Sequence, residues 1–279
     1  MAAHLVKIAC ERPDAVGRSL SQWDCRELAA ELVGQGVVRT ISPDSVRRIL
    51  DGHRLKPWRH HLWIGDKTPR DQAFADAVRE VCDLYTRALL PFEMVLCVDE
   101  QTNLQPRPRR QPTRAALPGL AARVEHEYGR CGSLNLFAAL DTRSGRVYAR
   151  LSPRKRADDF IAFLEQLDRE LPADKTLVHV VLDNLRVHKS KKVKAWLAGH
   201  PRFVFHHPPV HCSWMNQVEQ GFGILRRKRF GINDFADLTQ LSERVLRFVE
   251  QWNQKAHAFS WTPQSFQKIL AKCESRLAA

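Results

Sequence analysis

The chain has 279 residues, of which 44% are hydrophobic, so it can hold one sizeable core and a smaller accessory domain. A net charge of +13 and a pI near 9.8 are typical of proteins that bind nucleic acids. No stretch approaches the ~20 apolar residues of a membrane helix, the first residues lack the apolar core of a signal peptide, and seven scattered cysteines indicate reduced thiols. These features exclude a membrane protein and a disulfide scaffold, and we expect a cytoplasmic protein.

Two helical patterns open the chain. Leu5–Cys10 is apolar and is broken by Pro13 and Gly17. Ser21 offers an N-cap for a second helix, which ends at Gly34. The apolar stripe of that second helix consists of Cys25, Leu28, Ala29, Leu32 and Val33.

A third helix follows a short turn. Ser42 and Pro43 supply a cap and a first-turn proline, and Arg47 and Arg48 lie on the polar side. Two short helices around a glycine-containing turn, the second of them basic, fit a helix-turn-helix with Ser42–Leu50 as its recognition element. We expect Ser42, Arg47 and Arg48 to contact DNA. An ordinary helical pair with a solvated charged face is the alternative.

The middle of the chain connects two expected domains. Residues 53–68 are basic and contain proline, which is typical of a linker, and Pro69–Leu90 has one apolar face, which predicts a helix. That helix would brace the following domain or connect it to the preceding one. We therefore divide the chain into a partial helix-turn-helix domain at 1–62, a linker and connecting helix at 63–90, and an α/β domain at 91–279.

Strand and helix patterns alternate in residues 91–279, which predicts a mixed α/β layer. The predicted strands are Phe92–Val98, Ser133–Leu140, Arg146–Leu151, Val178–Leu182 and Arg202–His206; the predicted helices are Arg156–Leu171, Val187–Ala198, Ser213–Phe230 and Leu238–Gln254. Gln101–Gly119 is rich in proline and arginine and reads as an irregular loop. It would hold DNA, or else form a solvated insertion.

Three acids stand where these elements would bring them together. Asp99 and Asp183 each follow a buried strand, and Glu219 shares a helical stripe with Asn216. If the two strands are adjacent and the helix packs across them, three carboxylates converge and must either protonate or bind a cation. An all-oxygen site suits Mg²⁺ or Mn²⁺, used in pairs roughly 3.5–4 Å apart for in-line chemistry at phosphates. Glu100 would face the other way by strand alternation and support the site.

Clusters of basic residues lie close to these acids in the sequence, where a phosphate backbone would run. The predicted DNA contacts are Arg107, Arg109, Arg110, Lys189, Lys191, Lys192, Arg226, Arg227 and Lys228. Other chemistries fit poorly, because the chain contains neither a G-x-x-x-x-G-K-[ST] phosphate loop nor a G-x-S-x-G nucleophile elbow.

An ordered set of short motifs carries a family resemblance. The motifs are Cys97-Val-Asp-Glu-Gln-Thr102, Asn135-Leu-Phe-Ala-Ala-Leu-Asp141, Val181-Leu-Asp-Asn184 with His188-Lys189, Ser213-Trp-Met-Asn-Gln-Val-Glu219 and Phe259-Ser-Trp-Thr-Pro263, and 35 residues separate Asp183 from Glu219. In this order and spacing the chain resembles transposases of the bacterial insertion-sequence branch of the mariner superfamily, the group named after insertion sequence six-thirty.

The resemblance implies a ribonuclease-H-like mixed sheet flanked by helices, preceded by a small all-α helix-turn-helix domain. It implies a catalytic triad of Asp99, Asp183 and Glu219 that holds two Mg²⁺ ions, with Mn²⁺ as a substitute. Asn184, His188 and Asn216 are the expected supporting or substrate-contacting residues. The implied reaction is cleavage of double-stranded DNA at terminal inverted repeats and strand transfer into target DNA, at TA, by a homodimer at the bacterial nucleoid.

Members of this group usually carry another helix-turn-helix ahead of residue 21, so we expect a shortened or split chain. Two rival functions remain open. One is a catalytically silent remnant that binds DNA as a repressor, and the other is a nuclease of the same fold that cleaves without strand transfer.

Overall fold

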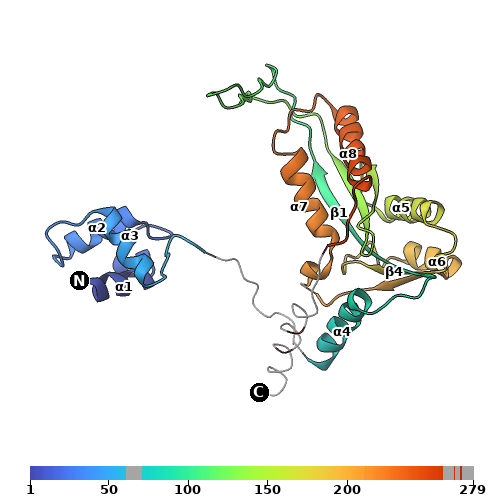
Figure 1. The fold of residues 1–279 in the computed structure, drawn as a ribbon, viewed down its shortest axis with the longest axis horizontal. Helices are drawn as coiled ribbons and strands as arrows, with labels where there is room; N and C mark the ends of the chain where they lie inside the picture. The colour runs from blue at the N-terminus through green and yellow to red at the C-terminus, as the bar shows by residue number, and fades with distance from the viewer. Residues whose placement is uncertain (61–70, 211, 260–266, 268–270, 272–279) are drawn as a thin grey trace. The chain divides into compact units, whose positions relative to one another are not determined.

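The computed structural model describes residues 1–60, 71–210, 212–259, 267 and 271. The chain divides into two compact units, Met1–Lys67 and Thr68–Ala279, each with its own hydrophobic core (Figure 1). In the part of the chain that the structure describes, every helix is too short or too polar to cross a membrane. Of the Phe259-Ser-Trp-Thr-Pro263 motif, only Phe259 belongs to the described residues.

The first unit is a small cluster of helices. It contains α1 (Ala2–Cys10), the 3₁₀ helix η1 (Pro13–Val16), α2 (Cys25–Gly34) and α3 (Pro43–Gly52). Its core consists of Leu5, Ile8, Ala9, Trp23, Leu28, Ala29, Leu32, Val46 and Leu50. These side chains come from α1, α2, α3 and the segment before α2, so the three helices bury their apolar faces against one another, as a small all-α domain requires.

The ends of these helices follow from local capping. α3 begins as predicted, because the Ser42 side chain accepts a hydrogen bond from the Ser45 amide at 3.1 Å. The predicted cap of α2 was wrong: the helix begins at Cys25, because Asp24 accepts from the amides of Arg26 and Glu27. Val33, placed in the apolar stripe of α2, is in fact exposed.

A five-stranded mixed sheet forms the centre of the second unit. Its strands are β1 (Glu93–Leu104), β2 (Leu134–Asp141), β3 (Val147–Ser152), β4 (Leu177–Val181) and β5 (Phe203–His206), in the order β3-β2-β1-β4-β5. β1 pairs antiparallel with β2 and parallel with β4, which itself pairs parallel with β5. The predicted hairpin of β2 and β3 and the adjacency of the two acid-bearing strands are thereby confirmed.

Helices cover both faces of this sheet (Figure 1). α4 (Gln72–Thr86), α7 (Val218–Arg229) and α8 (Leu238–Asn253) share a core with Val95 and Cys97 of β1. α5 (Ala157–Glu170) and α6 (Lys191–Gly199) share the opposite core with Leu96 and Val98. Alternate residues of β1 thus serve the two cores, and α4 belongs to the core of this unit.

Four predicted boundaries were wrong. β1 continues past Asp99 to Leu104, because residues 99–101 pair with β2. The predicted helix Ser213–Phe230 is divided into the short 3₁₀ helix η2 (Ser213–Met215) and α7. α6 begins at Lys191 and not at Val187, since the Ser190 side chain caps it. α4 likewise ends at Thr86, before the predicted end at Leu90.

The segment between β1 and β2 is an extended arm of residues 105–133, drawn in green in Figure 1. Isolated bridges join Arg109 to Tyr128, Arg114 to Arg123, and Leu117 to Leu120 across the arm. Only part of the predicted loop is therefore irregular: its first residues belong to β1, and the rest folds back on itself.

Candidate active site

Asp99 is a buried acid in the middle of β1. Only 9% of its surface is exposed, and its Oδ1 accepts a hydrogen bond from the Glu100 amide at 2.7 Å. Burial raises the pKa of Asp99 to about 7, and the negative charges of Glu100, Glu219 and Asp183 act in the same direction. A cation placed beside this group would therefore stabilise its ionised form.

Asp183 lies two residues beyond the end of β4. Its Oδ1 is 3.0 Å from Nδ1 of His188 and accepts from the Leu185 amide at 2.9 Å. The hydrogen bond with His188 is the main reason why the pKa of Asp183 is lowered, although burial opposes the shift. Asp183 is thus ionised at neutral pH while Asp99 retains much of its proton.

His188 is buried between two carboxylates. Its Nε2 lies 2.8 Å from Oε1 of Glu100, and its ring packs on Phe160 with a centroid distance of 4.5 Å. Burial alone would lower the pKa of His188, but the hydrogen bonds to Asp183 and Glu100 outweigh it and raise the pKa to about 9. The ring is therefore an imidazolium at neutral pH, with both nitrogens acting as donors.

Glu219 lies in the first turn of α7, and its residue is exposed. The buried Asn216, predicted to share a helix with it, precedes α7, and its side-chain amide donates to the Val98 carbonyl at 2.8 Å. This contact fastens the start of α7 to β1, next to Asp99. A carboxylate in the first turn of a helix is also favoured by the helix dipole.

The donor set fits a hard divalent cation, although the described residues hold no group of three His, Cys, Asp or Glu side chains already arranged as a metal cage. Asp99 senses the charges of both Asp183 and Glu219, and the single positive charge of His188 offsets only part of the negative charge that gathers there. Carboxylate oxygens are the ligands that Mg²⁺ and Mn²⁺ prefer. The three acids come from neighbouring elements, but Glu219 is exposed to solvent while Asp99 is buried.

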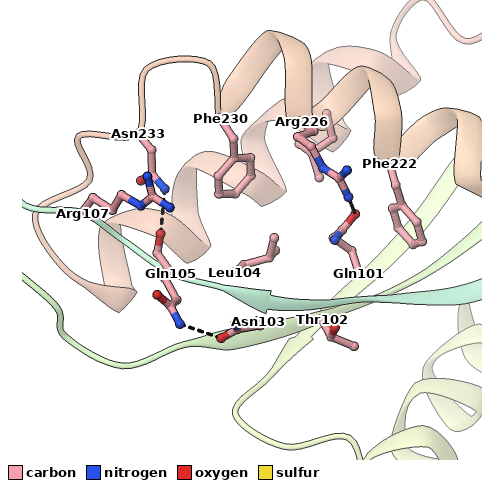
Figure 2. A pocket seen from close by; sticks show the side chains of 11 residues that line it. Gln101, Thr102, Asn103, Leu104, Gln105, Arg107, Phe222, Arg226, Phe230 and Asn233 are labelled. Carbon is pink, nitrogen blue, oxygen red and sulfur yellow. Dashed lines mark hydrogen bonds between the residues drawn. The ribbon is translucent and has the colours of Figure 1, made fainter. Parts of the chain in front are cut away.

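Two cavities lie in this region, and only the first of them is lined by one of the three acids. One, of about 300 Å³, is lined by Asp183, Asn184, Asn216 and the loop that follows β5. The other, of about 320 Å³, lies between the end of β1 and α7. Figure 2 shows Arg226 reaching into this second cavity to Gln101, whose Oε1 accepts a hydrogen bond at 3.0 Å. Both cavities offer room for a polar substrate.

The predicted supporting residues make mostly internal contacts. The side-chain amide of Asn184 donates to the Pro208 carbonyl and accepts from Lys189. Ser42 of the first unit, which was predicted to contact DNA, uses its side chain to cap α3. Contacts near the site that the sequence did not reveal are the Phe160 ring on His188 and a hydrogen bond of His207 Nδ1 with the Asp183 carbonyl at 3.0 Å. Nothing in the local pattern signals them, since both depend on tertiary packing.

The predicted DNA-contacting cations differ in how they are engaged. Arg109 donates to backbone carbonyls within the arm and to that of Asn233, so its guanidinium is structural. Ion pairs engage Arg47 and Arg48 with Asp44, Arg110 with Glu127, and Lys192 with Asp158. The other predicted contacts are exposed: Arg107, Lys189, Lys191, Arg226, Arg227 and Lys228. Exposed ion pairs are weak, so a phosphate can displace their carboxylates.

Comparison with known proteins identifies the family. Residues 94–242 match the DDE superfamily endonucleases. An uncharacterized 39 kDa protein of insertion element IS630 from Shigella sonnei is 29% identical over 115 residues, which is 41% of this chain and 33% of that protein. The match therefore spans a third of the relative's length.

Solved structures share the fold. The Mos1 strand transfer complex is 14% identical with a TM-score of 0.52, and the comparison covers 100% of this chain and 77% of that one. The Mos1 mariner paired end complex with Mn is 16% identical with a TM-score of 0.50, covering 100% and 78%. The ribonuclease-H-like prediction is confirmed. The chain belongs to the DDE superfamily endonucleases, is similar to a protein of insertion element IS630, and shares its fold with the Mos1 complexes.

Proposed function

We propose that this chain cleaves DNA at the ends of a transposable element and joins the freed 3′ ends to target DNA, with two divalent metal ions held by Asp99, Asp183 and Glu219. The observation that supports this most directly is the placement of the acids: Asp99 is buried on β1, Asp183 follows the neighbouring β4, and Glu219 comes from the first turn of α7. Burial and the nearby carboxylates raise the pKa of Asp99 to about 7. Clustered acids with perturbed pKa values are typical of functional sites.

The protein's own groups would position the reacting phosphate. Asp99 stands on β1, Asp183 stands just beyond the end of the neighbouring β4, and Glu219 approaches from α7. Bound Mg²⁺ or Mn²⁺ would activate the attacking water or 3′-hydroxyl and stabilise the leaving oxygen. Exposed Arg226, Arg227 and Lys228 continue α7 beyond Glu219 and would neutralise the DNA backbone that follows the scissile phosphate.

The partners follow from the family. The Mos1 structures are a strand transfer complex and a paired end complex. By likeness, we propose that this chain binds terminal repeats through its first unit and target DNA, at TA, through its second. Two ends must be held together for transfer, so we propose a homodimer.

The test is cleavage of DNA carrying the element's own terminal repeats, with Mg²⁺, Mn²⁺ or EDTA. Wild type should nick the ends only with metal, and Asp183→Ala should abolish nicking. Asp168→Ala is the matched control, because Asp168 pairs with Arg202 on the α5 side of the sheet; it should keep activity.

The products separate the rival functions. Joined products are expected from a transposase, whereas nicking without joining would indicate a nuclease. DNA binding without cleavage in either metal would refute the proposal and leave a DNA-binding protein.

A further inference from the structure

Glu100 is a buried acid beside the site that no step of the proposed reaction uses. It follows Asp99 in β1 but faces the other side of the sheet, where its side chain is 5% exposed and reaches His188. A buried carboxylate needs a partner to offset its desolvation, and here the partner is a ring that also contacts Asp183. Glu100 is thus linked to both aspartates: to Asp99 through the backbone and to Asp183 through His188.

The position of this link matters. The parallel pairing of β1 with β4 ends at Cys97 and Val181. Asp99 and Asp183 each stand two residues further along, so the β1–β4 ladder does not fix the distance between them. The chain of contacts Glu100–His188–Asp183 crosses between the two strands at this level, with atom separations of 2.8 and 3.0 Å. Beyond the last backbone pair of β1 and β4, these side-chain contacts therefore connect the two segments.

We infer that Glu100 is a positioning residue that acts through His188 to orient Asp183 for cation binding; this rests on the proposed function. His188 and the Leu185 amide both contact Oδ1 of Asp183. Oδ2 accepts no hydrogen bond from the residues that the structure describes, so it is the oxygen available to an ion. Without Glu100, the ring loses the contact that holds its Nδ1 against Asp183, and the carboxylate can rotate.

A second Glu–His contact between the same strands provides a matched control. His179 of β4 lies 3.4 Å from Glu93 at the start of β1, and both residues are buried. This pair joins β1 to β4 as the Glu100–His188 pair does, but at the opposite end of the strands from the acids. Loss of Glu93 should weaken the fold without changing cation binding.

The experiment compares full-length wild type, Glu100→Ala, Glu100→Gln and Glu93→Ala, each held well below its unfolding temperature. Mn²⁺ affinity is measured by electron paramagnetic resonance, and cleavage is measured as a function of Mn²⁺ concentration. Loss of an outer-shell partner typically costs 10–100-fold in metal affinity, so Glu100→Ala should need about 10–100-fold more Mn²⁺ in both assays. Glu100→Gln should stay close to wild type, because its amide oxygen still accepts from Nε2, and Glu93→Ala should match wild type.

Two results would overturn the inference: an unchanged Mn²⁺ requirement in Glu100→Ala, or an equal increase in Glu93→Ala, which would reduce Glu100 to a fold-stabilising residue. The proposed function fails separately. If wild type binds Mn²⁺ with an affinity that only Glu100→Ala weakens, but cleaves no DNA, the positioning role stands and the proposed function falls. Wild type that binds no Mn²⁺ would refute both.

Discussion

Replacing Asp99 by Asn should stabilise the metal-free protein at neutral pH. The folded-state pKa of Asp99 is about 7, above the ordinary value of 3.8, because burial disfavours its charge. The folded state therefore holds a proton that the unfolded chain releases, and stability falls as pH rises from 3.8 to about 7. A pKa shift of this size destabilises the folded protein by at most about 4 kcal/mol above pH 7, and it has no effect on stability well below pH 3.8. Asn keeps the side-chain oxygen that accepts from the Glu100 amide.

The assay is urea unfolding in EDTA, with wild type and Asp99→Asn compared at about pH 4 and about pH 8. We expect nearly equal stability at the lower pH and a gain of a few kcal/mol for the variant at the higher pH. Added Mg²⁺ should stabilise wild type more than the variant, since only wild type carries the full set of acids. A variant that is no more stable than wild type at pH 8, or whose gain is independent of pH, would refute the argument that Asp99 is destabilising when ionised.

Three further predictions concern stability. Arg87 and the Leu90 amide lower the pKa of Glu93 to about 2, so the stabilisation of the fold by Glu93 is present above pH 4.5 and lost as the pH falls toward 2. In urea unfolding, Glu93→Gln should lower the free energy of unfolding by roughly 2–3 kcal/mol at pH 7 and by little near pH 2. Arg54, just after α3, has a φ of 52°, a backbone conformation that glycine adopts more easily than arginine. Arg54→Gly should therefore stabilise the fold by ~0.5–1 kcal/mol and raise the thermal midpoint, and a lower midpoint would contradict this. Gly145→Ala should cost about 2 kcal/mol or more by urea unfolding, since its Cβ would meet the His257 backbone, whereas Gly132→Ala, also at positive φ, meets only the Leu238 side chain and should cost less.

Periodicity and resemblance predicted the sheet and its neighbours well because buried strands and amphipathic helices leave strong local signals. The apolar runs before Asp99 and Asp183 gave the two central parallel strands, and Phe160, Phe163, Leu164 and Leu167 gave α5. Helix starts were less accurate, because several side chains compete to cap one helix. Asp24 caps α2 although Ser21 was also available, and Ser190 delays the start of α6.

The contacts within the site were harder to predict because they join distant parts of the chain. Strand alternation placed Glu100 on the face opposite Asp99, but the sequence could not show that it meets His188, which is 88 residues further along. The division of the predicted helix before Glu219 follows from Asn216, whose side-chain amide donates to the Val98 carbonyl while its oxygen accepts from the Val218 amide at the start of α7. The backbone carbonyls to which Arg109 donates could not be predicted either, because charge alone does not reveal such partners.

The acids of the site stand on supports of unequal stiffness. Asp99 is held by the backbone ladder of β1 with β2, and Asp183, just beyond the end of β4, is held by the Leu185 amide and His188, so moving either one breaks hydrogen bonds. Glu219 rests on α7, which meets the sheet through side chains such as Phe222 and through Asn216. A helix packed in this way can tilt by repacking alone. When the spacing between the attacking and leaving oxygens changes, we therefore expect α7 to move while the sheet stays in place. Natural variation at Phe222 should change the position of Glu219 relative to the two aspartates.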